Sequence, residues 1–157
     1  MLDSIIQNTT GLLHTIAAVL AMILGLVVIF NKKGTKTHIR IGYVYVFSML
    51  FLNISSFFIV NFDGFSIFHF FAIVSLATIV AGIIPVYFKT KNWYVKHFYF
   101  MSWSVVGLYC AFWSEVGVRF VRNMKDFWWM VAIATFLTAF IGAIFINKEA
   151  KKLNLHS

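Results

Sequence analysis

The sequence has few charged residues, one proline and one cysteine, and these shortages exclude several classes of protein. Charged residues make up 11% of the 157 residues, whereas a soluble domain carries about 25%. Cys110, the single cysteine, cannot form an intrachain disulfide, and it lies inside an apolar run. The nine glycines are scattered, so the sequence has no glycine-rich phosphate-binding loop. A disulfide-rich scaffold and a soluble enzyme are therefore both disfavoured.

Long apolar runs take the place of these features, and hydrophobic residues make up 61% of the chain. About 20 helical residues cross the hydrocarbon core of a bilayer. We predict an all-α integral membrane protein, a single transmembrane domain over residues 1–157 with about five helices, at 11–30, 40–61, 66–88, 94–119 and 127–147. Short connectors indicate that the first four form an antiparallel core. The fifth has few interior polar groups, so we expect it to be peripheral.

Basic residues gather in the loops on one predicted side of the membrane, and this asymmetry predicts the orientation. That side holds Lys32, Lys33, Lys36, Arg40, Lys89, Lys91, Lys96, Lys148, Lys151 and Lys152, and the other side holds Arg119, Arg122 and Lys125. The positive-inside rule predicts a multi-pass protein of the cell membrane with its N-terminus outside and its C-terminus in the cytoplasm. Because the net charge of +8 lies beside membrane helices, we expect the lipid bilayer, and not nucleic acid, as the partner.

Four histidines lie near the starts of the first four predicted helices, one on each: His14, His38, His69 and His97. Since consecutive helices alternate in direction, His14 and His69 lie toward the outer face, and His38 and His97 toward the cytoplasm. In an up-down bundle the first and third helices are diagonal, as are the second and fourth. The pattern therefore predicts an outer and an inner histidine pair.

Several polar and small residues share helical faces with these histidines. Ser56 lies on the face of His38, and both Ser104 and Glu115 lie on the face of His97. Ionisable groups at membrane depth indicate function by default.

Ordinary packing is the competing interpretation. The small residues Ala18, Ala21 and Gly25 follow His14 at helical spacing, and such residues let membrane helices approach closely. Glu115 and Arg119, four residues apart, are also spaced to form a simple ion pair.

Three stretches resemble a family of uncharacterised bacterial multi-pass membrane proteins, a domain of unknown function. They are HIRIGYVY at residues 38–45, FHFFA at 68–72 and HFYFMSWS at 97–104. His14, Glu115 and Arg119 complete the resemblance, which covers about the first 120 residues. The family implies a multi-pass membrane fold but no established activity.

The histidine pattern is also similar to the transmembrane dihaem cytochromes b that pass electrons from ascorbate. His38 to Gly42, and the run Ala81-Gly82-Ile83, recur in that family. This chain departs from it by having five predicted helices instead of six and by lacking an ascorbate-site signature. The resemblance implies that His14 with His69, and His38 with His97, bind haem b, with Arg40 near the propionates and Ser56, Ser104 and Arg119 in support.

Two other functions stay open at this point. His14, His69 and Glu115 make a two-histidine, one-carboxylate set that suits a catalytic zinc ion. Ser56 would then orient the substrate, a lipid amide or ester that the enzyme hydrolyses. A non-catalytic membrane subunit or small carrier, whose polar interior serves assembly or proton movement, is the remaining alternative.

Overall fold

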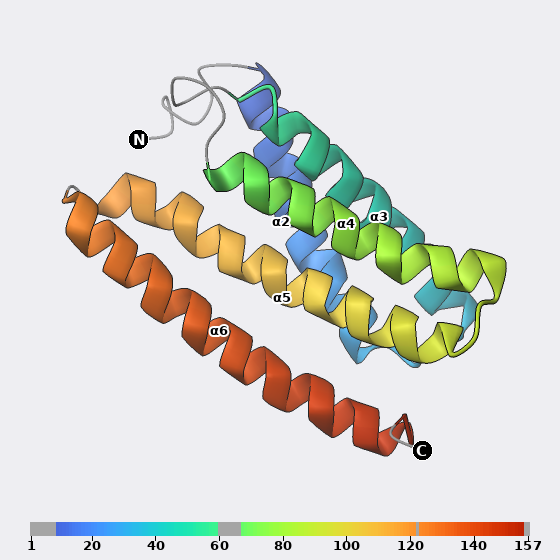
Figure 1. The fold of residues 1–157 in the computed structure, drawn as a ribbon. Coiled ribbons are helices and arrows are strands. Elements are labelled where there is room, and N and C mark those ends of the chain that lie inside the picture. The colour runs from blue at the N-terminus through green and yellow to red at the C-terminus, as the bar shows by residue number, and fades with distance from the viewer. Residues whose placement is uncertain (1–8, 60–66, 122, 156–157) are drawn as a thin grey trace. The chain divides into compact units, whose positions relative to one another are not determined.

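The computed structural model describes residues 9–59, 67–121 and 123–155, apart from the side chains of residues 118 and 119. The described residues form five α-helices and no strand, which confirms the all-α fold. In chain order they are α2 (Thr9–Phe30), α3 (Lys36–Ser56), α4 (Ile67–Phe88), α5 (Trp93–Phe120) and α6 (Met124–Lys152) (Figure 1).

Four of the helices in the described part, α2, α3, α4 and α6, are long and apolar enough to cross a membrane. Helix α5 has 28 residues but falls outside this set. It contains Lys96 and Glu115 and is rich in tyrosine, tryptophan and serine, all of which lower its hydropathy. That α5 also crosses the membrane stays a prediction.

The chain divides into two compact units, Met1–Ile79 and Val80–Ser157, and the boundary falls inside α4. Unit 1 therefore contains α2, α3 and the first half of α4, and unit 2 contains the rest. Each unit is described separately below.

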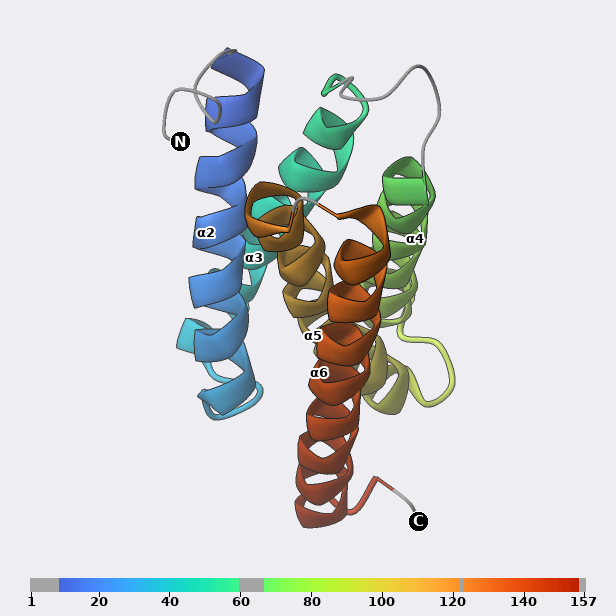
Figure 2. The ribbon, with the colours of Figure 1, turned by 90° about the vertical axis from the view of Figure 1, so that its left-hand side faces the viewer.

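In unit 1, α2 and α3 pack against each other as an antiparallel pair (Figure 2). The buried residues of α2 are Ala17, Ala21 and Gly25, all small. Ala18, predicted to belong to this stripe, is half-buried, and Ala17 takes the more buried position. Small side chains let membrane helices approach closely, which supports the packing interpretation of this stripe.

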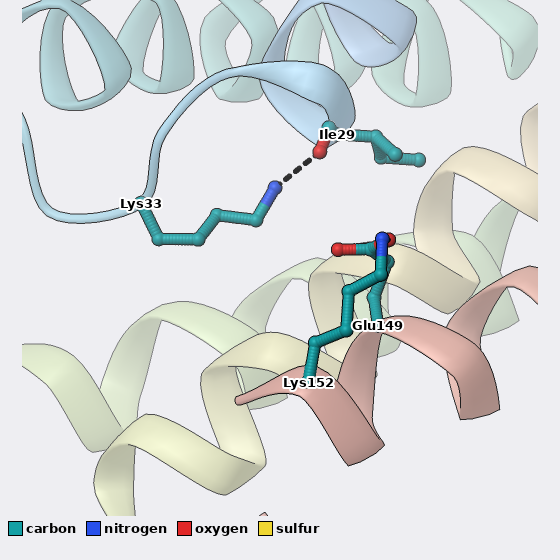
Figure 3. A network of polar contacts seen from close by, with 4 residues as sticks. All are labelled: Ile29, Lys33, Glu149 and Lys152. Atoms are coloured by element: carbon teal, nitrogen blue, oxygen red, sulfur yellow. Dashed lines mark hydrogen bonds and ion pairs between the residues drawn. The ribbon is translucent and has the colours of Figure 1, made fainter. Parts of the chain in front are cut away.

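The turn between α2 and α3 is held by side chains at both helix ends. Lys33 Nζ donates to the carbonyls of Val28, at 3.0 Å, and of Ile29 (Figure 3). Those carbonyls belong to the last turn of α2, where a cation interacts favourably with the helix dipole. Thr35 then caps α3 by accepting a hydrogen bond from the backbone N–H of His38 at 3.1 Å.

Helix α3 lies earlier in the sequence than the predicted 40–61. It begins at Lys36 because the Thr35 cap satisfies a first-turn N–H, and charged residues in that turn do not prevent a helix. It ends at Ser56, with Phe57 as the C-cap. The predicted residues 60 and 61 lie outside the described residues.

In unit 2, α5 and α6 lie side by side and run antiparallel (Figures 1 and 2). A Cβ atom at Gly142 would lie 2.5 Å from Cγ2 of Val106, so only glycine allows this approach. The indole N–H of Trp113 donates to Thr138 Oγ1 at 2.9 Å. Thr138, a polar residue of α6, therefore helps to pair α5 with α6.

Helix α6 extends beyond the predicted 127–147 at both ends. The Asn123 side chain caps its start by accepting from the Lys125 N–H, and Lys152 pairs with Glu149 near its end (Figure 3). Most of its large apolar side chains are exposed: Trp128, Trp129, Ile133, Phe136, Leu137, Phe140, Ile141, Ile144 and Phe145. Such a surface belongs in a bilayer, where lipid tails cover it.

Candidate functional site

One predicted histidine pair lies within a single unit, and the other is divided between the two units. His14 and His69, the outer pair, both belong to unit 1. The inner pair is divided, because His38 belongs to unit 1 and His97 to unit 2. The outer pair is therefore considered within one unit, and each inner histidine by itself.

His14 forms a hydrogen bond with a serine on the neighbouring helix. Its Nδ1 lies 2.9 Å from Oγ of Ser55, a buried residue in the last turn of α3. The single hydroxyl proton of Ser55 is donated to the carbonyl of Leu52 at 3.0 Å. Ser55 must therefore accept at His14, so Nδ1 is protonated and the lone pair of the neutral imidazole lies on Nε2.

Ser55 is a site residue that the sequence did not reveal. Counting five helical turns from His38 led to Ser56, but the Ser56 hydroxyl donates to the Asn53 carbonyl at 2.7 Å. The face of α3 that includes Ser48, Leu52 and Ser55 is buried. Burial of this face favours Ser55, and the hydrogen bond to His14 decides between the two serines.

His69 lies in the first turn of α4 and is buried, with 9% of its surface exposed. Its ring is 5.5 Å from the ring of Phe57, measured between centroids, at an interplanar angle of 39°. Phe57 is the C-cap of α3. An aromatic side chain at the end of one helix therefore contacts the second histidine of the outer pair.

His97, in the second turn of α5, forms a hydrogen bond with the backbone of α4. Its Nδ1 lies 2.9 Å from the carbonyl oxygen of Gly82. Because a carbonyl only accepts, Nδ1 of His97 must carry a proton, and the lone pair of the neutral ring lies on Nε2. The tautomer is the same as in His14.

Gly82 allows the close approach that this hydrogen bond requires. A Cβ atom at this position would lie 2.8 Å from Sδ of Met101 and 3.3 Å from Cβ of Phe100. The acceptor for the His97 ring is therefore the Gly82 carbonyl, in the Ala-Gly-Ile run of α4.

His38 is placed through its backbone, because its N–H donates to the Thr35 cap. Gly42 lies one turn further along α3. A Cβ atom there would meet nothing within 4 Å, so this side of the helix near His38 has open space.

The remaining predicted residues are spread over both units. Ser104 is buried, and its hydroxyl donates to the Met101 carbonyl at 2.7 Å. Arg40 and Glu115 are exposed, and the side chain of Arg119 lies outside the described residues. None of these observations links the residue to a histidine on another helix. The supporting roles predicted for them therefore stay predictions.

Within either unit, the described residues form no group of three His, Cys, Asp or Glu side chains able to hold a metal ion. The zinc set predicted from the sequence takes His14 and His69 from unit 1 and Glu115 from unit 2. That set therefore stays a prediction.

The long apolar helices define the class of protein, an integral membrane protein that lies in a lipid bilayer. The family described as predicted membrane protein DUF2306 matches residues 11–149, and the chain belongs to it. This confirms the predicted membership of an uncharacterised multi-pass membrane family. No curated protein and no solved structure matches the chain.

Proposed function

We propose that this protein is a membrane cytochrome that binds haem b through its paired histidines and moves electrons across the bilayer. His14 and His69, both in unit 1, would hold one haem near the outer face, and His38 and His97 remain the ligands that the sequence predicts for the other. When bound, haem iron supplies reversible one-electron chemistry.

The observation that supports this function is the shared tautomer of His14 and His97. One histidine from each predicted pair donates its Nδ1 proton to an acceptor on another helix, Ser55 Oγ or the Gly82 carbonyl. Metal-binding histidines almost always donate their second ring N–H in this way, which orients the ring and makes the other nitrogen a better donor. If His14 and His97 only packed between helices, nothing would require them to have the same tautomer.

The surroundings of the other two histidines also fit this role. His69 is buried beside the Phe57 ring, so water is kept from one face of the imidazole. Lys36 lies just before His38 in the sequence and Arg40 just after it, and both are exposed. Their charges suit the propionate groups of a haem.

For the direction of insertion, we propose that the N-terminus faces outward and the C-terminus faces the cytoplasm. The excess of lysine and arginine in the loops after α2 and α4 and at the end of α6 supports this orientation. Reporter fusions at each end, one active only outside and one only in the cytoplasm, test it. Equal reporter activity at both ends would indicate four crossings instead of five.

An absorption spectrum combined with metal analysis tests the proposed cofactor. Full-length protein purified in detergent from haem-supplied cells should be red, with a Soret band that shifts on adding dithionite. A colourless protein from such cells would contradict the proposal. Stoichiometric zinc that is lost in His69→Ala but kept in His97→Ala would instead indicate the hydrolase, and no cofactor at all would indicate a non-catalytic subunit.

A further inference from the structure

Two hydrogen bonds in series connect the His14 ring to the backbone of α3. The Nδ1–H group of His14 donates to Ser55 Oγ at 2.9 Å, and the Ser55 hydroxyl donates to the Leu52 carbonyl at 3.0 Å. Each bond polarises the next, so the hydroxyl accepts more strongly than an isolated one would. The series begins on α2 and ends on a backbone group that the helix holds in place.

Ser55 is also held in one orientation by its surroundings. Only 6% of its surface is exposed, so water does not compete for its hydroxyl. Its neighbour Ser56 is less buried, and the Ser56 hydroxyl donates to the Asn53 carbonyl of its own helix. Two adjacent serines on one helix therefore differ in whether they act on the His14 ring.

We propose that Ser55 is the positioning residue for His14, which it orients and makes a stronger electron donor through Nδ1. This inference rests on the proposed haem site. A hydrogen bond accepted from Nδ1–H shifts electron density toward Nε2 and raises the basicity of the ligand. Stronger donation stabilises ferric over ferrous iron, so Ser55 lowers the midpoint potential of the outer haem.

Ser55→Ala, with Ser56→Ala as the matched control, tests the inference in the full-length protein loaded with haem. In Ser55→Ala we expect about a tenfold weaker affinity of the outer haem and a positive shift of its midpoint potential in a redox titration. Ser55→Thr keeps a hydroxyl and should restore both values. Ser56→Ala should match the wild type.

The outcomes separate this inference from the function on which it rests. If the wild-type protein binds no haem, the proposed function itself is wrong. Haem-loaded Ser55→Ala with wild-type affinity and potential would overturn the role of Ser55 and leave the function standing.

A second measurement determines the His14 tautomer in the wild-type protein itself. In wild-type protein labelled with ¹⁵N-histidine, the His14 signal, assigned by its loss in His14→Gln, should show a protonated Nδ1. A protonated Nε2 with a bare Nδ1 would overturn the inference.

Discussion

His14 and His97 reach the same tautomer through different acceptors, a side-chain hydroxyl in unit 1 and a backbone carbonyl in unit 2. A backbone carbonyl cannot be removed by substitution, and its position depends on how closely two helices approach. A hydroxyl can be removed by changing one residue, with the helices left in place. The unit 1 interaction is therefore open to tuning by mutation, whereas the unit 2 interaction depends on packing around Gly82.

The largest expected effect comes from removing the rings themselves. His14→Ala and His97→Ala should each lose one of the two proposed haems, and the double variant should lose both, because an alanine supplies no axial ligand. The pyridine haemochrome assay measures the haem content per chain. His156→Ala, outside the predicted pairs, is the control, and equal haem content in all four variants would contradict both sites.

Gly82→Ala tests the dependence of His97 on packing. The added methyl group meets Met101 Sδ at 2.8 Å and Phe100 Cβ at 3.3 Å, so the Met101 side chain must move and the α5 backbone at Phe100 must yield, which strains the hydrogen bond between the Gly82 carbonyl and the His97 ring. Overpacking of this kind costs about 1–3 kcal/mol. We expect a lower melting temperature in detergent and loss of the inner haem only.

Gly107→Ala on α5 is the control for this prediction, because its Cβ would meet nothing within 4 Å. The substitution should leave the melting temperature unchanged or raise it, since alanine favours a helix more than glycine does. The same loss in both variants would show that close approach at Gly82 is not the cause.

Thr35→Ala extends the comparison to His38, whose backbone N–H donates to Thr35 Oγ1 at 3.1 Å. Removing an N-cap hydroxyl costs about 1 kcal/mol, and the start of α3 should fray. Thermal unfolding followed by circular dichroism measures the effect. Thr37→Ala, at an exposed position two residues later, should be neutral, and an equal loss there would remove the capping explanation.

Trp113→Phe is expected to have the smallest effect. It measures how much the hydrogen bond to the Thr138 hydroxyl contributes to the stability of unit 2. It removes the 2.9 Å hydrogen bond to Thr138 Oγ1 but keeps an aromatic ring. Interhelical hydrogen bonds in membrane proteins contribute about 0.6 kcal/mol on average, so the melting temperature should fall slightly. Trp103→Phe, on the same helix, is the control, and a fall of the same size there would discount the hydrogen bond.

Most of the helices could be predicted from the sequence because long apolar runs leave few alternatives in a bilayer. The end of α2 at Phe30 and the end of α4 at Phe88 agree with the predicted residues 30 and 88. The start of α3 differs by four residues, since hydropathy does not register a cap such as Thr35. Helix α5 was predicted from its long apolar run, and its crossing of the membrane stays a prediction.

The candidate site was predictable only in part. The positions of His14 and His69 in the sequence placed both in the outer pair, and both belong to one unit. The choice of Ser56 over Ser55 depended on a rotation of about 100° around the helix axis, which periodicity alone does not resolve. The contact with His14 decides between them.

The sequence by itself determined that the protein is helical, lies in a membrane and has one histidine near the start of each of its first four helices. Hydrophobic length and residue spacing suffice for these features, because they act along one helix at a time. Only the tertiary structure decided which acceptor each ring meets, Ser55 for His14 and the Gly82 carbonyl for His97. The reason is that a hydrogen bond between helices depends on their separation and rotation, and small residues such as Ala21 and Gly82 set both through packing.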